Sequence, residues 1–513
     1  MSEVRGAPGG SAGESSPRRG RGTGRPPRRK ASTSGQQSTA SSSIAPQSTV
    51  ERALAVARAD GETVVIADET STANLRWAGN TLTTNGVATS RALTVISIDR
   101  RADGTAGVGA VTRSGVTPDQ VEDLVREAEK SAAEASPAED VQELVPPGDL
   151  TLSEHFTHYN TQYNEADRPG FGVFRGFASE LGETLRAAEA AGRKLYGFAE
   201  HGITSTFVGT SAGVRLRYDQ PAGRLELNAK SADMTRSAWA GAATRDFTDV
   251  DVAALDAGLA ERLGWQARKV ELPAGRYETL LPPTATSDLM TYLYWSAGAR
   301  EAAEGRTVFS KTGGGTRVGE RLSQVQADLF SDPGYPGLEC APFVVAHSSG
   351  RDSSVFDNGL AAGRANWISA GVLSALHSSR YSAATAGLPV TPAVDNLIMS
   401  APGATASLDS MISSTKRGLL LTCLWYIRLV DPQTLLLTGL TRDGVYLIEN
   451  GEVVAAVNNF RFNESPVGML GRLVEVGATE KTLPREWGDY FNRAAMPTLR
   501  VDGFNMSSVS QAS

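Results

Sequence analysis

Histidine is scarce in this chain of 513 residues: there are five, and none of them is followed by glutamate. A zinc peptidase helix needs two histidines four or five residues apart with an adjacent glutamate, so that both imidazoles face one metal ion. The pair His155 and His158 lacks an obvious third ligand. We therefore expect no metal site in this chain and no catalytic residue of a zinc peptidase.

The two cysteines, Cys340 and Cys423, are too few for a disulfide framework, which favours a reducing compartment. No run of 18 or more apolar residues is present, so nothing in the sequence predicts a membrane span. Arginine pairs near the N-terminus have no apolar segment behind them, unlike a secretory signal. We expect a cytoplasmic protein.

The net charge of −7 is unevenly distributed along the chain. Residues 1–48 hold eight Arg or Lys against Glu3 and Glu14, and they are otherwise mostly Ser, Gly, Pro and Thr. Such a composition predicts a disordered tail, because it offers almost no apolar surface to bury. A basic arm can bind nucleic acid phosphates, but this one has no aromatic residue for base stacking. We favour a solvated extension and keep nucleic acid association as an alternative.

The rest of the chain predicts an α+β fold. In residues 49–145, Asn85-Gly86 and Asp103-Gly104 are hairpin turn signals between β-branched segments, and a helix follows. Residues 146–275 repeat this combination of a meander and a helix. Residues 276–513 are rich in strands, with Asn450-Gly451 as the strongest turn signal. We expect two antiparallel meander-plus-helix halves and a β-rich, barrel-like C-terminal region.

The string Gly209-Thr210-Ser211-Ala212-Gly213 has the spacing of the nucleophile elbow of serine hydrolases. The elbow requires a strand, a turn and a helix, whereas the flanks here predict two strands. We therefore predict a hairpin turn. A self-sufficient peptide hydrolase that uses Ser211 stays the second alternative.

Several strings of the C-terminal half resemble the signature of the TldD/PmbA family. They include Ser414 to Leu421, Thr438 to Val445, Asn459 to Pro466 and Met496 to Phe504. The residues that carry the motifs are Arg321, Trp367, Trp425, Arg428, Arg442, Asp443, Arg461, Asn463 and Glu464.

The family has two forms that pair with each other. One carries a His-Glu-x-x-x-His zinc helix and hydrolyses peptides, and the TldE/PmbA form lacks these ligands. The corresponding stretch here, Tyr292 to Arg300, has aromatic residues and alanine instead. The resemblance therefore implies a non-catalytic subunit without its own cofactor. It would form a heterodimer or higher oligomer with a TldD-like zinc metalloprotease and help to process or degrade small unfolded or modified peptides.

A cap at Ser287-Asp288 and an apolar stripe of Leu289, Leu293 and Ala297 predict that this stretch lies on a helix that packs rather than ligates. Its aromatic side chains have two interpretations. We favour burial in the core, and the alternative is that they line a peptide chamber shared with the partner. The candidate substrate-binding residues are Tyr292, Tyr294, Trp295 and Arg300.

Overall fold

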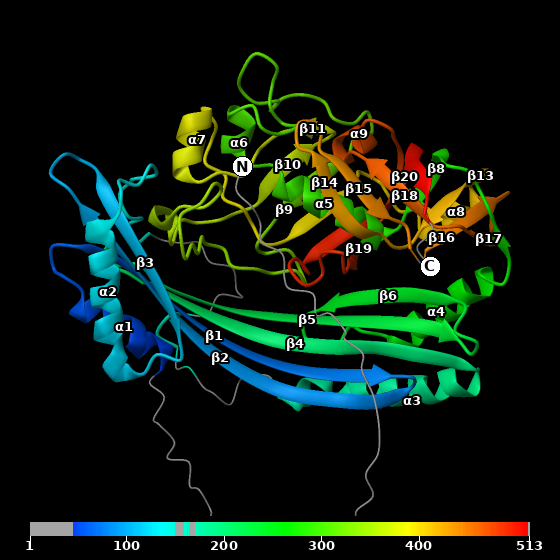
Figure 1. Cartoon of the computed structure of the whole chain (residues 1–513), viewed down its shortest axis with the longest axis horizontal. Coiled ribbons are helices and arrows are strands. Elements are labelled where there is room, and N and C mark those ends of the chain that lie inside the picture. The colour runs from blue at the N-terminus through cyan, green and yellow to red at the C-terminus, as the bar shows by residue number, and fades with distance from the viewer. Residues whose placement is uncertain (1–44, 149–157, 162, 164–169, 443, 511–513) are drawn as a thin grey trace, which may run out of the picture. The chain divides into compact units, whose positions relative to one another are not determined.

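The computed structural model describes residues 45–148, 158–161, 163, 170–442 and 444–510. It contains both helices and strands, and the strands form two sheets (Figure 1). The predicted α+β class is confirmed. The basic tail, up to residue 44, lies outside the described residues, as does His155.

The first sheet is antiparallel and joins the two predicted meanders side by side. Its strand order is β3-β2-β1-β4-β5-β6, and the central pair β1 and β4 runs in register from Val64 opposite Thr210 to Trp77 opposite Gly197. The strands are β1 (Glu62–Ala78), β2 (Thr81–Arg100), β3 (Ala106–Ser114), β4 (Arg193–Thr210), β5 (Arg215–Ser231) and β6 (Ser237–Thr244).

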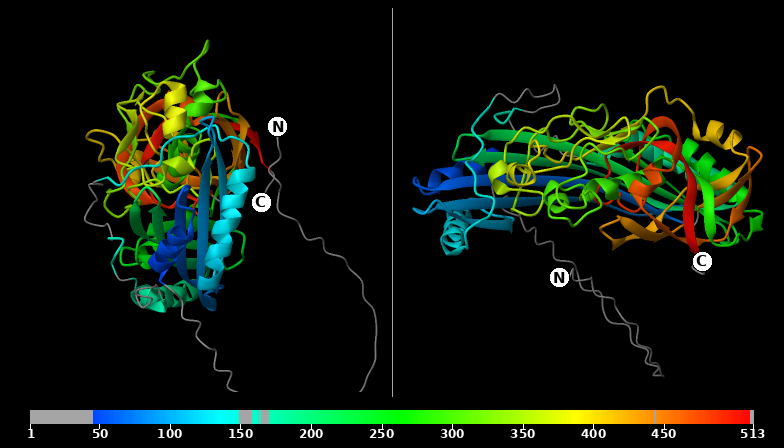
Figure 2. Two further views of the ribbon diagram at one scale, coloured as in Figure 1. Left: turned by 90° about the vertical axis from the view of Figure 1, so that its left-hand side faces the viewer. Right: turned by 90° about the horizontal axis from the view of Figure 1, so that it is seen from above.

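Each meander is preceded and followed by a helix, so the first 265 residues contain the same arrangement twice. These helices are α1 (Pro46–Val56), α2 (Val121–Glu134), α3 (Arg175–Ala190) and α4 (Val252–Trp265). They cover one face of the sheet, as the two further views in Figure 2 show. The approach of α2 to β3 is close: a Cβ on Gly109 would lie 2.3 Å from the carbonyl oxygen of Ala128. Only glycine fits there without a shift of the helix.

One predicted turn is wrong. Asn85 and Gly86 lie inside β2, opposite Leu75 and Asn74 of β1, and the hairpin turns instead at Gly79-Asn80. Both of these residues have positive φ angles, as a tight two-residue hairpin turn requires. The long, continuous pairing of β1 with β2 overrides the local Asn-Gly signal.

The predicted hairpin around Ser211 is confirmed. Ser211 lies in the turn between β4 and β5, and its Oγ accepts a hydrogen bond from the backbone N–H of Thr63 at 2.9 Å. The serine therefore holds the turn against β1, and no helix follows it.

The second sheet contains the C-terminal strands, with β20 (Ala494–Val509) paired to four neighbours, β8, β12, β18 and β19. The predicted turn at Asn450-Gly451 is confirmed between β16 and β17. The other strands are β7 (Lys269–Val270), β8 (Gly275–Leu281), β9 (Asp328–Ser331), β10 (Ala365–Ser369), β11 (Val372–Leu373), β12 (Leu397–Ser400), β13 (Arg417–Leu421), β14 (Trp425–Asp431), β15 (Leu436–Leu440), β16 (Val445–Glu449), β17 (Glu452–Val457), β18 (Phe460–Glu464) and β19 (Leu473–Thr482).

Five helices accompany this sheet: α5 (Pro283–Trp295), α6 (Ala299–Ala303), α7 (Arg380–Ala386), α8 (Leu408–Ser413) and α9 (Pro466–Leu470). The largest hydrophobic core of the molecule lies between α5 and the strands around β20. None of the described helices is long and apolar enough to cross a membrane.

A stacked arginine joins the two sheets. The guanidinium of Arg485 lies 3.7 Å from the ring centroid of Trp425 on β14 and 4.9 Å from that of Trp239 on β6. It also pairs with Glu226 of β5 at 3.4 Å. Cation–π contacts of this kind are strong when the cation is desolvated. They fix the segment around residue 485 against the first sheet.

Candidate functional site

Helix α5 begins before the predicted cap. Pro283 occupies its first turn, and Ser287 and Asp288 are fully buried inside the helix rather than at its end. Proline is favoured in the first turn because this position needs no N–H donor. The predicted apolar stripe is present in part: Leu289 and Leu293 lie on α5, whereas Ala297 lies beyond its last residue, Trp295; all three are buried.

The structure separates the four candidate substrate-binding residues. Tyr294 is buried, and its hydroxyl donates to the carbonyl of Val394 at 2.9 Å and accepts from the N–H of Val394 at 2.8 Å. Arg300 lies on α6, where it pairs with Glu139 at 2.7 Å and Glu304 at 2.9 Å. Tyr294 is thus held in the core, where its ring lies 6.1 Å from that of Phe491, and Arg300 lies on a different helix from the other three candidates.

Tyr292 and Trp295 lie three residues apart on α5 and share a side of the helix. Their rings are 5.5 and 5.3 Å from the ring of Trp487, and Trp295 is also 6.2 Å from Phe491. Trp295 is 38% exposed. We call Tyr292, Trp295 and Trp487 the aromatic surface; it packs on Phe491, which is buried. Aromatic rings that are packed on one side and wet on the other are typical of binding surfaces.

The side chains at α5 do not fit a zinc ion. The hydroxyl of Tyr294 is already engaged, and the neighbouring His377 is buried, with its Nδ1 3.9 Å from Asp352. Burial lowers the pKa of His377. A zinc site takes at least three protein ligands. Within the part of the chain that the structure describes, no three His, Cys, Asp or Glu residues gather in such a group.

The segment of residues 484–493 is fastened to α5 by Asp288. The backbone N–H of Glu486 donates to Oδ1 of Asp288 at 2.8 Å, and the indole N–H of Trp487 donates to the backbone carbonyl of Asp288 at 2.9 Å. Burial raises the pKa of Asp288 well above its ordinary value of 3.8. The folded protein therefore binds a proton at Asp288 more tightly than the unfolded chain does.

This raised pKa predicts a pH-dependent stability. A carboxyl group of this kind stabilises the fold fully below its unfolded pKa, and its contribution is lost as the pH rises above about 3.8 towards the folded pKa. Asp288→Asn removes the titration. We expect the denaturation midpoint of the variant relative to wild type to rise between pH 5 and pH 8, measured by urea unfolding. A difference that is constant across this range would contradict the prediction.

Glu486 links the same segment to strand β14. Its carboxylate accepts from the backbone N–H groups of Tyr426 at 3.0 Å and Ile427 at 3.2 Å, and it pairs with Arg428 at 3.0 Å. Among the described strands, β14 pairs only with β15. The aromatic surface therefore borders a strand edge whose first donors are occupied by Glu486.

The motif residues of the C-terminal strands lie mostly on one ribbon formed by β14, β15 and β18. Arg428 and Asn463 are both in register with Thr438 of β15, and Arg461 donates to the Thr438 hydroxyl at 3.3 Å. Trp425 stacks on Arg485. Arg442 is half-buried after β15.

The contacts of the remaining motif residues stabilise the fold. Glu464 is buried and accepts from Arg472 at 2.6 Å, and Arg321 donates to the carbonyl of Ala370 at 2.9 Å. Trp367 is buried, and its indole N–H donates to Ser331 at 2.9 Å. Asp443 lies outside the described residues.

A polar cleft of about 860 Å³ lies on the other side of residues 484–493. Alternate residues of β1, β4 and β5 form its floor, because side chains two apart on a strand share one face. Asp68 accepts from the hydroxyl of Thr206 at 2.5 Å and contacts Nε2 of His347 at 2.8 Å, and the hydroxyls of Thr70 and Thr204 are 3.1 Å apart. The floor is thus lined with hydroxyl and carboxylate groups.

Two ion pairs form the wall of the polar cleft. Arg224 pairs with Asp489, and its guanidinium lies 4.8 Å from the ring centroid of Phe198. Arg493 pairs with Asp395, and burial lowers the pKa of this arginine. Asp489 and Arg493 belong to the same segment that carries Trp487. Residues 484–493 therefore contribute to the aromatic surface on one side and to the polar cleft on the other.

Sequence analysis did not predict the polar cleft. Its signal is the alternation of polar residues in otherwise apolar strands, at Asp68, Thr70 and Thr72 of β1 and at Thr204 and Thr206 of β4. Hydroxyl residues at alternate positions indicate that the second face of a sheet is not packed as a dry core.

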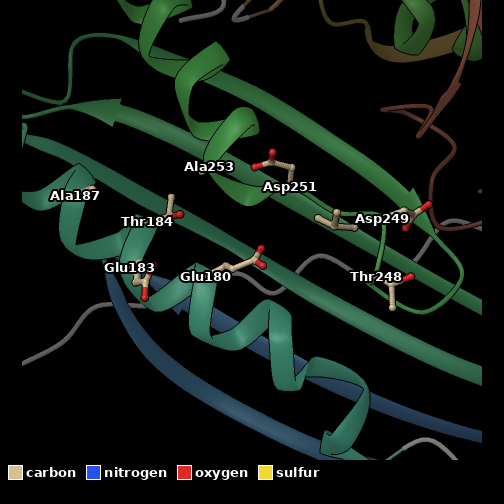
Figure 3. Close-up of a pocket in the computed structure, with 9 residues that line it drawn as sticks. Glu180, Glu183, Thr184, Ala187, Thr248, Asp249, Asp251 and Ala253 are labelled. Atoms are coloured by element: carbon tan, nitrogen blue, oxygen red, sulfur yellow. The ribbon is translucent and has the colours of Figure 1, made fainter.

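A second hollow of about 570 Å³ lies between α3 and the start of α4 (Figure 3). Glu180 and Glu183 of α3 and Asp249 and Asp251 of the following loop line it. Asp251 accepts from the N–H of Ala254 at 2.8 Å and so caps α4, and Asp249 pairs with Lys481 at 2.6 Å. Two of the four carboxylates thus have structural partners, and we assign this hollow no function.

Solved structures share this fold over nearly their whole length. TldE from Thermococcus kodakarensis has a TM-score of 0.71 at 16% identity, and the match covers 90% of this chain and 99% of that one. A Thermotoga maritima protein, proposed to modulate a DNA gyrase, has a TM-score of 0.69 at 16% identity with the same coverage. A Bacteroides thetaiotaomicron protein with a similar description has 0.67 at 15%, covering 90% and 98%. No curated protein matches the sequence significantly.

Fold and sequence together define an α+β protein with a C-terminal domain of metallopeptidase type. Residues 274–508 match the family model of the PmbA/TldA metallopeptidase C-terminal domain. This domain is of the PmbA/TldA family, and the chain as a whole shares the fold of TldE.

Proposed function

We propose that this chain is the non-catalytic, zinc-free subunit of a peptidase pair, of the TldE/PmbA type. It associates with a TldD-like zinc metalloprotease of the same fold as a heterodimer or higher oligomer. The pair binds small unfolded or modified peptides and processes or degrades them. The zinc ion belongs to the partner, and the scarcity of cysteine supports a cytoplasmic location.

The observation that carries the proposal is the make-up of helix α5. The family resemblance places the zinc helix of the catalytic form at Tyr292 to Arg300. Here Tyr294 is engaged by Val394 in the core, Trp295 faces solvent, and the whole sequence has no His-Glu pair. The helix retains its packing role and lacks the donors that zinc requires.

The polar cleft and the aromatic surface support a role in holding peptides. An extended peptide has unpaired N–H and C=O groups along its length, and threonine hydroxyls both donate and accept hydrogen bonds. The rings of Tyr292 and Trp295 supply apolar contact area on the other side of residues 484–493. The polar cleft and the aromatic surface therefore bind the backbone and the overall shape of a peptide, with little dependence on the peptide's sequence.

The test is co-purification of the full chain with a homologous subunit that carries His-Glu-x-x-x-His. We expect a stable complex with zinc in the partner alone, and cleavage of an unstructured peptide by the complex but not by this chain. The matched control is a partner whose motif glutamate is replaced by glutamine, which should assemble without cleaving. Stoichiometric zinc in this chain, or chelator-sensitive cleavage by this chain alone, would overturn the proposal.

A further inference from the structure

Strand β2 has a free outer edge along about half of its length. Strand β3 pairs with it only from Ala92 to Arg100, and residues 81–90 pair with β1 on their inner side. No described strand pairs with their outer side. We call residues 81–90 the β2 edge. It follows the margin of the first sheet in Figure 1.

The β2 edge lacks two of the features that normally prevent edge-to-edge pairing, charge and proline, and its one bulge lies near its start, where Thr83 is unpaired between Leu82 and Thr84. Its ten residues include no charged side chain and no proline, and nine of the ten are exposed. Leu82 is 56% exposed and Val87 is 48% exposed. Natural edge strands are usually protected by lysine, proline, a bulge or a covering segment. From Thr84 to Ser90 the edge is regular, neutral and free of proline, so this stretch is a template for another strand.

The second meander shows how this fold covers the equivalent edge. Strand β6 pairs with β5 only over residues 223–230, and residues 215–222 extend beyond it. That stretch is contacted by other parts of the chain: Arg217 donates to the carbonyl of Thr161 at 3.0 Å, and Gln220 donates to that of Glu339 at 3.1 Å. The described residues provide no such cover for the β2 edge.

We propose that the β2 edge pairs in antiparallel fashion with the β2 edge of a second copy of this chain, around a two-fold axis. A two-fold interface brings the same surface together twice, so it must be self-complementary. A strand without charge meets this condition, because no like charges come to lie opposite each other. The pairing satisfies the backbone groups of both edges and extends the first sheet from one copy into the next.

Self-association through the β2 edge is separate from the proposed pairing with a zinc-bearing subunit, and it uses different residues. The aromatic surface and the motif residues of β14 to β18 lie outside residues 81–90, so a copy bound at the β2 edge leaves them available. An interface based on one strand pair is small, and its population depends on protein concentration.

The experiment measures self-association of the full chain by sedimentation equilibrium over a range of concentrations. The test variant is Leu82→Lys/Val87→Lys, and the matched control is Val390→Lys/Val474→Lys, whose valines are 46% and 54% exposed elsewhere. We expect wild type and control to dimerise alike, and the edge variant to associate at least tenfold more weakly. Equal melting temperatures of all three proteins show that the fold is intact.

A charge-swap variant keeps the proposal falsifiable. Leu82→Glu/Val87→Glu should also be monomeric alone, and an equimolar mixture of the lysine and glutamate variants should form mixed dimers. The proposal is overturned if wild type stays monomeric, if the lysine variant dimerises like wild type, or if the mixture stays monomeric. Peptide cleavage with the zinc-bearing partner is measured separately. The experiments can therefore refute self-association and the proposed peptidase pair independently of each other.

Discussion

Replacing Arg500 by methionine is expected to lower the free energy of unfolding by about 1–3 kcal/mol, the cost of leaving a buried hydrogen-bonding group without its partner. The arginine side chain is only 8% exposed. Its loss leaves the buried hydroxyl of Thr415 and the half-exposed carboxylates of Glu475 and Glu278 without this donor, and methionine fills the volume without replacing the hydrogen bonds. The partners are Glu475 and Glu278 at 2.9 Å, Thr415 at 2.5 Å, Ser414 at 2.7 Å and the carbonyl of Met411 at 3.0 Å.

Arg500→Lys is the control for this prediction. Lysine keeps the positive charge but has one nitrogen in place of three, so it cannot reach the two glutamates and the Ser414–Thr415 hydroxyls at once. We expect its denaturation midpoint in urea to lie between those of wild type and Arg500→Met. A methionine variant as stable as wild type would show that the network contributes little to the fold.

Truncation of Trp295 to alanine is expected to raise KM for peptide cleavage by the assembled pair roughly thirtyfold, with kcat little changed. The figure corresponds to about 2 kcal/mol, the usual threshold for a binding hot spot. Trp295 is part of the aromatic surface and is far enough exposed to contact a ligand. Because the zinc and its ligands belong to the partner in our proposal, loss of the ring weakens binding and leaves the chemistry intact.

The control for Trp295→Ala is Phe171→Ala, which removes an aromatic ring that is 44% exposed but lies outside the aromatic surface. Its KM should match wild type. Assembly and zinc content are measured on the same samples. An unchanged KM for Trp295→Ala in an intact complex would exclude the aromatic surface from peptide binding and leave the polar cleft as the remaining candidate.

The two Asn-Gly dipeptides show how far local signals predict this fold. Asn450-Gly451 forms a turn because the strands on both sides end there, with Glu449 opposite Glu452. Asn85-Gly86 has the same turn chemistry and forms none, because β1 and β2 pair continuously past it. The free energy of a long ladder exceeds the preference of one dipeptide, and the length of a ladder is not a local property.

Helix α5 illustrates the same limit for the candidate site. The sequence predicts a helix with an apolar stripe, and the helix is present and carries two of the three stripe residues. Tyr294 is buried and hydrogen-bonded to Val394, whereas Tyr292 and Trp295, three residues apart, share another part of the helix surface. Which side faces the core depends on Val394 and Trp487, which lie about 100 and 190 residues further along the chain.

The amino-acid sequence by itself determined that this chain has no His-Glu pair, that it is an α+β protein, and that it resembles the TldD/PmbA family. These properties depend on residue types and local periodicity. Only the tertiary structure placed residues 484–493 between the aromatic surface and the polar cleft, and only it showed that no described strand pairs with the β2 edge. Both features arise where distant segments meet or fail to meet, and no local pattern encodes that.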